Sequence, residues 1–234
     1  MHSTITRAQN IFGFFTTVLF VLGAIIASTD FLAPRTPSAD VFVKDIQVVR
    51  GRPHYYSTKK EEYASIRFSL SADFSSLFNW NTKQIFVWVS ATWPEPSASN
   101  KSIHTNEAVI WDTIITSPSS DHLQNIGPVA MKKLIKSAKG KSIDPSRGKI
   151  ELRNQKPKYQ ITAPSGKLAE LDDVLLKVHY NIQPWVGILT WTQQVEFWNW
   201  KVIEGGVSKI FKLPALKKKD EKKDEKKKTT KKAT

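Results

Sequence analysis

Residues 66–72 have the sequence Ile-Arg-Phe-Ser-Leu-Ser-Ala, in which apolar and polar side chains alternate without interruption. Because successive side chains of a strand point to opposite faces of a sheet, this pattern predicts a strand with one buried and one exposed face. Residues 73–80 then favour a short helical turn. Ile85 to Val89 is apolar on both faces, as expected of a central strand.

Four further segments outside this pair have strand character. Val41 to Val49 is rich in β-branched residues, and Ala108 to Ile115 and Asp173 to Ile182 are similar. Gly187 to Trp198 follows as a possible hairpin partner. The segments are short, and no regular alternation of strands with helices is visible. We therefore expect a mainly β chain in which residues 40–213 form an antiparallel β-sandwich with one or two short helices.

One basic helix is predicted within this body. Between Pro128, which is well placed at a helix start, and Gly140, a typical C-cap, apolar residues recur at i, i+3, i+4 and i+7. The favoured interpretation is a helix packed on the sandwich with a solvated basic face. The alternative is a docking face for an acidic partner or for lipid head groups. The basic residues are Lys132, Lys133, Lys136 and Lys139.

The amino-terminal region contains a long uncharged segment. Ala8 to Thr29 carries no charged side chain, and a helix of this length extends about 33 Å, against a bilayer hydrocarbon core of about 30 Å. The apolar stretch is longer than the roughly 7–15 residues typical of a cleaved signal peptide. We therefore expect an uncleaved signal-anchor transmembrane helix over residues 11–29. A cleaved signal peptide and a buried core helix are the alternatives.

Charged residues beside this segment indicate its orientation. Arg7 and the α-amino group precede it without an acid, whereas acidic and basic residues are mixed on its other side. Because basic residues favour the cytosolic side, we expect residues 1–10 in the cytosol and the body, after a linker at residues 30–39, on the opposite side. The sequon Asn100-Lys101-Ser102 fits this placement and makes Asn100 a glycosylation candidate.

The net charge of +14 is unevenly distributed. Residues 132–158 hold ten basic and two acidic residues, and the chain from residue 217 onward holds ten Lys against four acids. The rest of the chain is close to neutral. The net charge is therefore a weak argument for nucleic-acid binding, which needs a basic face that also carries side chains able to contact the bases. We expect the Lys-rich tail, residues 214–234, to be disordered because it has no apolar anchor from residue 217.

The sequence contains no recognisable catalytic or metal-binding constellation. Cys is absent, which excludes a thiol nucleophile and Cys-ligated zinc, and the five His lack metal-ligand spacing. Ser57 to Lys60 matches Ser-x-x-Lys, but it lies in a polar loop pattern without supporting motifs. His179 lies in a strand pattern and is expected to be a packed or surface residue. We therefore predict no catalytic residue, no metal and no cofactor.

Six short stretches carry a family resemblance. They are Phe68 to Asp73, Leu77 to Phe86, Asn106 to Asp112, Asn181 to Pro184, Gly187 to Leu189, and Arg7 to Asn10 before the apolar segment. Together they resemble the signal peptidase complex subunit 3 family, over residues 1 to about 203. The resemblance is strongest between Ile66 and Asp112, where order and spacing both match. Residues 121–158 match poorly, and the Lys-rich tail lies outside the resemblance.

Within these stretches a set of polar and aromatic residues forms the family signature. Trp80 lies between two turn-forming Asn residues, and we interpret it as an anchor for the entry to the next strand. The Asn side chains are expected to bond loop backbone groups. The signature is therefore interpreted as structural in preference to a partner contact. It comprises Asn79, Trp80, Asn81, Lys83, Gln84, Trp111 and Asp112.

The resemblance implies a non-catalytic accessory subunit of the endoplasmic reticulum signal peptidase, with one span, a cytosolic amino terminus and a lumenal β-sandwich. It implies as partners the catalytic serine subunit, the other small membrane subunits, the lipid bilayer and, indirectly, nascent preproteins, but no nucleic acid. One alternative is a secreted or membrane-anchored β-sandwich binding module unrelated to proteolysis. A hydrolase is disfavoured by the missing motifs, and a nucleic-acid binder by the predicted span.

Overall fold

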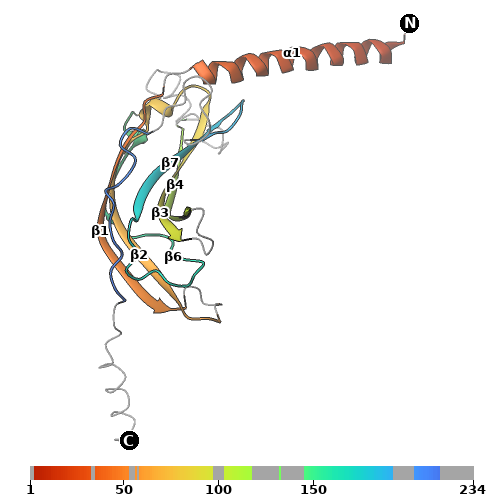
Figure 1. Cartoon of the computed structure of the whole chain (residues 1–234). Helices are drawn as coiled ribbons and strands as arrows, with labels where there is room; N and C mark the ends of the chain where they lie inside the picture. The colour runs from red at the N-terminus through yellow and green to blue at the C-terminus, as the bar shows by residue number, and fades with distance from the viewer. Residues whose placement is uncertain are drawn as a thin grey trace, which may run out of the picture.

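The computed structural model describes residues 3–32, 35–52, 56, 58–96, 103–117, 132, 145–191 and 203–216. Within these ranges the chain forms one long helix and two antiparallel sheets that face each other (Figure 1). Of the four lysines in the predicted basic helix, Lys132 is described and has helical backbone. Asn100 and the other three lysines, Lys133, Lys136 and Lys139, lie outside the described residues.

Each sheet has four strands. Sheet A consists of β1 (Ser38–Gly51), β2 (Glu61–Asp73) and β5 (Lys149–Gln155) in that order, with β6 (Ile161–Thr162) also paired to β2. Sheet B has the order β4 (Ile103–Thr116), β3 (Thr82–Pro96), β7 (Leu175–Pro184) and β8 (Thr190–Trp191). All these strand pairs are antiparallel, which confirms the predicted mainly β fold.

The core lies between the sheets because alternate residues of each strand point inward. From β2, Ile66, Phe68 and Leu70 are buried, as the alternation predicted. From β3, Ile85 and Val87 are buried opposite them in the same cluster. Burying one such side chain contributes about 1.5–3 kcal/mol relative to leaving it exposed, so these rows are a main source of the stability of the sandwich.

The link between the two sheets is a short helical turn, as predicted for residues 73–80. It is η1 (Ser75–Leu77), and η2 (Pro145–Gly148) packs against it. The amide of Phe74 donates to the carbonyl of Gly148 at 2.9 Å. A β-carbon on Gly148 would lie only 2.5 Å from the nitrogen of Ser75, so this close approach requires glycine.

The predicted hairpin partner at residues 187–198 is confirmed where the structure describes it. Thr190 pairs with Ile182, and Trp191 pairs with Asn181, in antiparallel register. Residues 192–198 lie outside the described part of the chain. The β7–β8 hairpin projects at the end of the sandwich from which the long helix departs (Figure 1).

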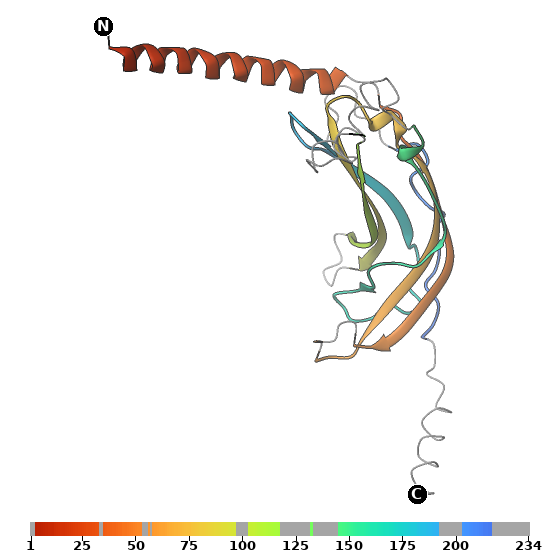
Figure 2. The ribbon, with the colours of Figure 1, turned by 180° about the vertical axis from the view of Figure 1, so that it is seen from behind.

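The long helix α1 (Thr4–Leu32) includes the predicted span. Residues 4–30 are long and apolar enough to cross a membrane, with a mean hydropathy of 2.3 in the best window, and this window is not buried by the rest of the chain. Figures 1 and 2 view the molecule from opposite directions. In both, α1 extends away from the sandwich on the side of sheet B, so the outer surface of sheet B faces the same side.

Candidate functional site

A buried ion pair fastens the end of α1 to the sandwich. Nη2 of Arg35 lies 2.7 Å from Oδ2 of Asp30, and both side chains are only 5% exposed. Arg35 also donates through Nη1 to Oγ1 of Thr190 at 3.3 Å, which ties the pair to β8. The side-chain amide of Asn79 donates to Oδ1 of Asp30 at 2.9 Å. The pair therefore joins the helix to the β7–β8 hairpin and to the turn before β3.

The last two turns of α1 pack on the sandwich along one stripe. Gly23, Ile26, Ala27 and Asp30 are partly or fully covered, and their i, i+3, i+4, i+7 spacing places them on one helix face. A β-carbon on Gly23 would lie 4.0 Å from Cγ1 of Val186, so the loop after β7 reaches this level of the helix. This stripe and the ion pair together set the direction of α1 relative to the sheets.

The two Asn of the family signature organise the turn before β3. Oδ1 of Asn79 accepts from the amide of Asn81 at 2.9 Å and from the hydroxyl of Thr82 at 2.8 Å. The Asn81 side chain donates to the carbonyl of Val186 at 2.7 Å and accepts from its amide at 3.1 Å. These bonds confirm that the Asn side chains bond loop backbone groups, including those of a loop about 100 residues away.

The interpretation of Trp80 as an anchor packed into the strand entry is wrong. Its side chain is 64% exposed, although it lies between the two Asn residues. The reason is that Asn79 and Asn81 hold the turn with their own hydrogen bonds, so Trp80 is turned outward. Sequence pattern alone predicts a turn here, but it does not indicate which of the three side chains faces the solvent.

The remaining signature residues lie in two separate places. Nζ of Lys83 lies 5.3 Å from the ring centroid of Trp185, near the turn that holds Trp80. The Gln84 side chain donates to the side-chain carbonyl of Gln183 on the neighbouring strand. On β4, Trp111 is only 6% exposed, and Asp112 forms an ion pair with Lys158, whose Nζ is 3.0 Å from Oδ1. The signature therefore does not converge on one catalytic centre.

A buried serine and a buried histidine meet a half-exposed glutamate on the outer side of sheet B. Oγ of Ser90 lies 2.8 Å from Nε2 of His179, and Oε1 of Glu107 lies 3.0 Å from the same Nε2. In a catalytic triad the nucleophile and the acid bind different ring nitrogens. A proton on Nε2 that is donated to Glu107 leaves this atom unable to accept the proton of Ser90. The arrangement therefore lacks the geometry of a nucleophile with its base.

Burial also argues for a structural role of this cluster. Ser90 is fully buried and His179 is nearly so, which leaves the hydroxyl out of reach of a peptide substrate. Desolvation lowers the pKa of His179 below its ordinary value, and the neighbouring Glu107 opposes that shift. The expectation of a packed residue at position 179 is confirmed. Its contacts were not predictable, because they join three different strands.

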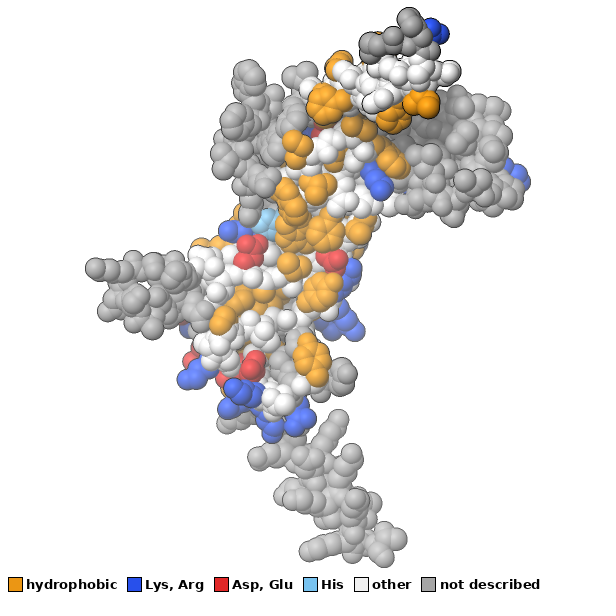
Figure 3. All heavy atoms as spheres, turned by 90° about the vertical axis from the view of Figure 1, so that its right-hand side faces the viewer, with side chains coloured by type: hydrophobic (Ala, Val, Ile, Leu, Met, Phe, Trp, Pro, Cys, Tyr) orange, Lys and Arg blue, Asp and Glu red, His pale blue; other side chains and the backbone are white. Residues whose placement is uncertain are grey.

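The outer surface of sheet B carries a partly exposed aromatic and aliphatic strip. Phe86 is the cross-strand neighbour of Ile114 on one side and of Asn181 on the other, and Asn181 is the neighbour of Trp191. Trp88 stacks on Phe86 with ring centroids 5.3 Å apart and meets Trp191 edge-on at 6.0 Å. Figure 3 shows apolar side chains gathered on this side of the molecule. We call it the outer aromatic face, made of Phe86, Trp88, Val109, Ile114 and Trp191.

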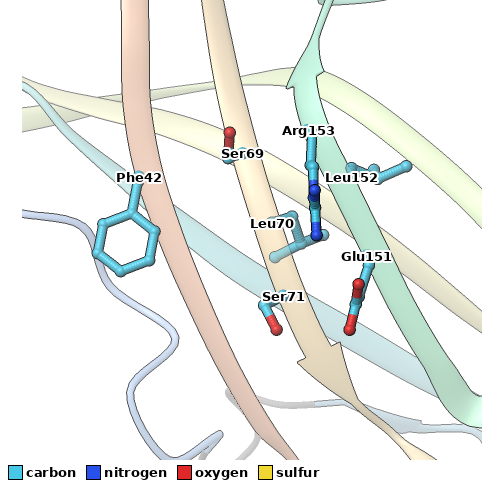
Figure 4. Close-up of a pocket in the computed structure, with 7 residues that line it drawn as sticks. All are labelled: Phe42, Ser69, Leu70, Ser71, Glu151, Leu152 and Arg153. Atoms are coloured by element: carbon cyan, nitrogen blue, oxygen red, sulfur yellow. The ribbon is translucent and has the colours of Figure 1, made fainter.

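Sheet A has an open groove on its outer surface, of about 270 Å³. Figure 4 shows how its lining residues come from the three neighbouring strands β1, β2 and β5. Among the described residues there is no group of three or more His, Cys, Asp or Glu side chains that could hold a metal ion. The groove is lined by Phe42, Ser69, Leu70, Ser71, Glu151, Leu152 and Arg153.

The chain resembles known proteins over most of its length. Residues 1–134 and 141–201 match the family model described as signal peptidase subunit. The chain is 30% identical over 197 residues to signal peptidase complex subunit 3 of Caenorhabditis briggsae, covering 82% of this chain and 89% of that one. It is 30% identical over 203 residues to the protein of the same name from Saccharomyces cerevisiae, covering 83% and 93%. The chain therefore belongs to the signal peptidase subunit family.

Proposed function

We propose that the chain is a non-catalytic accessory subunit of the endoplasmic reticulum signal peptidase complex. The family match over both the apolar helix and the sandwich is the observation that carries this proposal. Its partners are the catalytic serine subunit and the other small membrane subunits, and it acts on nascent preproteins only indirectly. The buried Ser90–His179 contact supports a non-catalytic role, because both Ser90 and Glu107 meet Nε2 of the ring.

The topology that we propose is a single span with a cytosolic amino terminus. Residues 1–10 face the cytosol, residues 11–29 cross the membrane, and a linker at 30–39 leads to the lumenal sandwich at 40–213 and the tail at 214–234. The exposed apolar surface of residues 8–29, which carry no charged side chain, supports the span, and Arg7 supports its orientation. Protease added to sealed microsomes should leave the sandwich intact, whereas digestion without detergent would refute this orientation.

The outer aromatic face is the surface that we propose to contact the catalytic subunit. An exposed apolar patch of this kind is typical of a protein interface, and Trp is enriched at interface centres. The direction of α1 supports the choice, because the outer aromatic face looks toward the side from which the membrane anchor arrives. A catalytic subunit embedded in the same bilayer would meet this face before it could meet sheet A.

A matched pair of substitutions tests this surface. Ile114 on β4 is 56% exposed and Phe42 on β1 is 54% exposed, so each accepts a charge without entering the core. In Ile114→Glu we expect the catalytic serine subunit to be lost from the detergent-solubilised complex. In Phe42→Glu we expect it to be retained. Equal recovery with both variants would contradict the assignment of the face, with circular dichroism as the control for folding.

A further inference from the structure

Five apolar side chains outside the core lie in the two loops that contact the end of α1. Trp80 lies in the turn before β3, and the other four lie in the loop between β7 and β8. All of them are more than a third exposed, and Ile188 reaches 66%. We call this set the tip patch: Trp80, Trp185, Val186, Ile188 and Leu189.

The loop after β7, which carries four of the five residues of the tip patch, lies beside the apolar turns of α1 and not beyond their end. Val186 faces the level of Gly23, and Gly187 faces Ala27, where a β-carbon would lie 3.6 Å from that of Ala27. Gly23 precedes Asp30 by seven residues, which is about 10 Å along a helix axis. The loop therefore runs back along the helix into the part of its sequence that is uncharged.

The charged residues near the tip patch do not oppose its burial in a membrane surface. Asp30 and Arg35 are paired and buried, so neither presents an exposed charge at this level. Residues 185–191 contain no charged side chain. The nearby Lys83 extends its amine over the Trp185 ring, which is how a long basic side chain keeps its head group in water beside an apolar surface.

We propose that the tip patch inserts into the lumenal interface of the bilayer beside α1. Trp is enriched at this depth because its ring is apolar while its N–H remains hydrated, and Trp80 and Trp185 provide two such rings. Ile188 and Leu189 would then lie among the upper acyl chains. The inference rests on the proposed membrane span, but it does not depend on docking to the catalytic subunit.

Insertion would fix the height and the tilt of the sandwich. The stripe and the ion pair attach the helix at one side of the tip, and the patch adds a second attachment to the same membrane surface. Two attachments restrict rocking about the end of α1. The outer aromatic face would consequently be held at a constant angle to the bilayer.

The absence of Cys from the sequence allows a direct depth measurement on the full chain. Single-Cys variants Ile188→Cys, Ile210→Cys and Phe14→Cys would be labelled with an environment-sensitive fluorophore and reconstituted into phosphatidylcholine vesicles. Ile188 and Ile210 are both 66% exposed, so they form a matched pair, and Phe14 lies within the proposed span. Quenching by lipids with a spin label on the upper acyl chain reports the depth of each probe.

We expect strong quenching and a blue-shifted emission at positions 188 and 14, and neither at position 210. If the probe at 14 is quenched while the probe at 188 behaves like that at 210, the insertion is refuted and the span stands. A blue shift at 188 without lipid quenching would mean that protein covers the patch, which also refutes insertion. If position 14 is not quenched, the span itself fails, and the inference fails with it.

Discussion

The two sheets share one core but differ in what their outer surfaces present. On β2 of sheet A the outward residues are Arg67, Ser69 and Ser71, whereas on β3 of sheet B they include Phe86 and Trp88. The inner rows are equally apolar and equally buried in both strands. Core burial therefore accounts for folding in both sheets. The difference in the outer rows supports the proposal that the outer surface of sheet B meets a partner.

The largest expected effect is the loss of stability when a buried aromatic side chain is removed, compared with the loss when an exposed one is removed. Trp111 is buried and meets the Phe68 ring edge-on at 6.0 Å. Trp111→Ala should lower the free energy of unfolding by about 3–5 kcal/mol, because it leaves a cavity in the core. Trp80→Ala, at a side chain that is 64% exposed, should change it by less than about 1 kcal/mol. Similar losses in urea unfolding of the two variants would contradict the distinction.

The next effect concerns the ion pair that sets the direction of α1. Arg35→Met removes the buried partner of Asp30 and should cost about 3 kcal/mol, because the carboxylate is left uncompensated. Adding Asp30→Leu should recover most of that loss. Lys212→Met breaks an exposed pair with Asp172 and should cost less than about 1 kcal/mol. Denaturant titrations of the purified chain in detergent would refute this account if the double variant were no more stable than Arg35→Met.

A smaller effect is a pH dependence that arises from sheet B. Burial lowers the pKa of His179 below 6.5, so the unfolded chain binds a proton more readily than the folded chain. The stabilising contribution of the neutral ring is therefore present above about pH 6.5 and is lost as the pH falls below it. For one proton, the slope of the unfolding free energy against pH cannot exceed about 1.4 kcal/mol per pH unit. His179→Gln should flatten the unfolding free energy between pH 6.5 and the lowered pKa, and an unchanged slope would contradict this origin.

Sheet A has its own titrating group, at a lower pH. Amide donors, first that of Ala169 and then that of Leu168, lower the pKa of Glu62 below 4.5. Its contribution is present above about pH 4.5 and is lost as the pH falls through the lowered value. Glu62→Gln should therefore lower stability above pH 4.5, flatten its fall below that pH, and leave the pH dependence near pH 6 unchanged, as measured by thermal unfolding. If Glu62→Gln changed the pH dependence of stability only near pH 6, the assignment of the lower pH range to sheet A and of the higher one to sheet B would be contradicted.

The smallest expected effect is on catalysis. Ser90→Ala removes the hydroxyl that contacts His179, and we expect signal-peptide cleavage by the assembled complex to be unchanged. The same result is expected for Ser69→Ala on the outer surface of sheet A. An assembled, folded Ser90→Ala complex without cleavage activity would refute the non-catalytic role.

The strands were predictable from sequence because their physical cause is local. Alternation at residues 66–72 and the apolar run at Ile85 to Val89 both reflect the burial of neighbouring side chains. Both faces of that run are apolar, but for different reasons. Val87 faces the core, whereas Phe86 and Trp88 face outward. Sequence could indicate a central strand here, but it could not distinguish a covered outer side from an exposed one.

The functional surfaces were less predictable because they depend on distant pairs. Asn81 binds the backbone of Val186, and Asp30 binds the side chain of Asn79, across separations of 105 and 49 residues. The outward position of Trp80 follows from these bonds and not from its own sequence neighbourhood. The long apolar segment indicated the anchor, but its contacts with the β7–β8 loop required the fold.

The proposed interface places the outer aromatic face, and not sheet A, against the catalytic subunit. The most direct test places a photo-reactive amino acid at position 114 or at position 42 of the full chain in native membranes. After illumination, mass spectrometry identifies the protein that is cross-linked at each position. We predict that the probe at 114 captures the catalytic serine subunit and that the probe at 42 does not. Capture of that subunit from position 42, with none from position 114, would contradict the proposed interface.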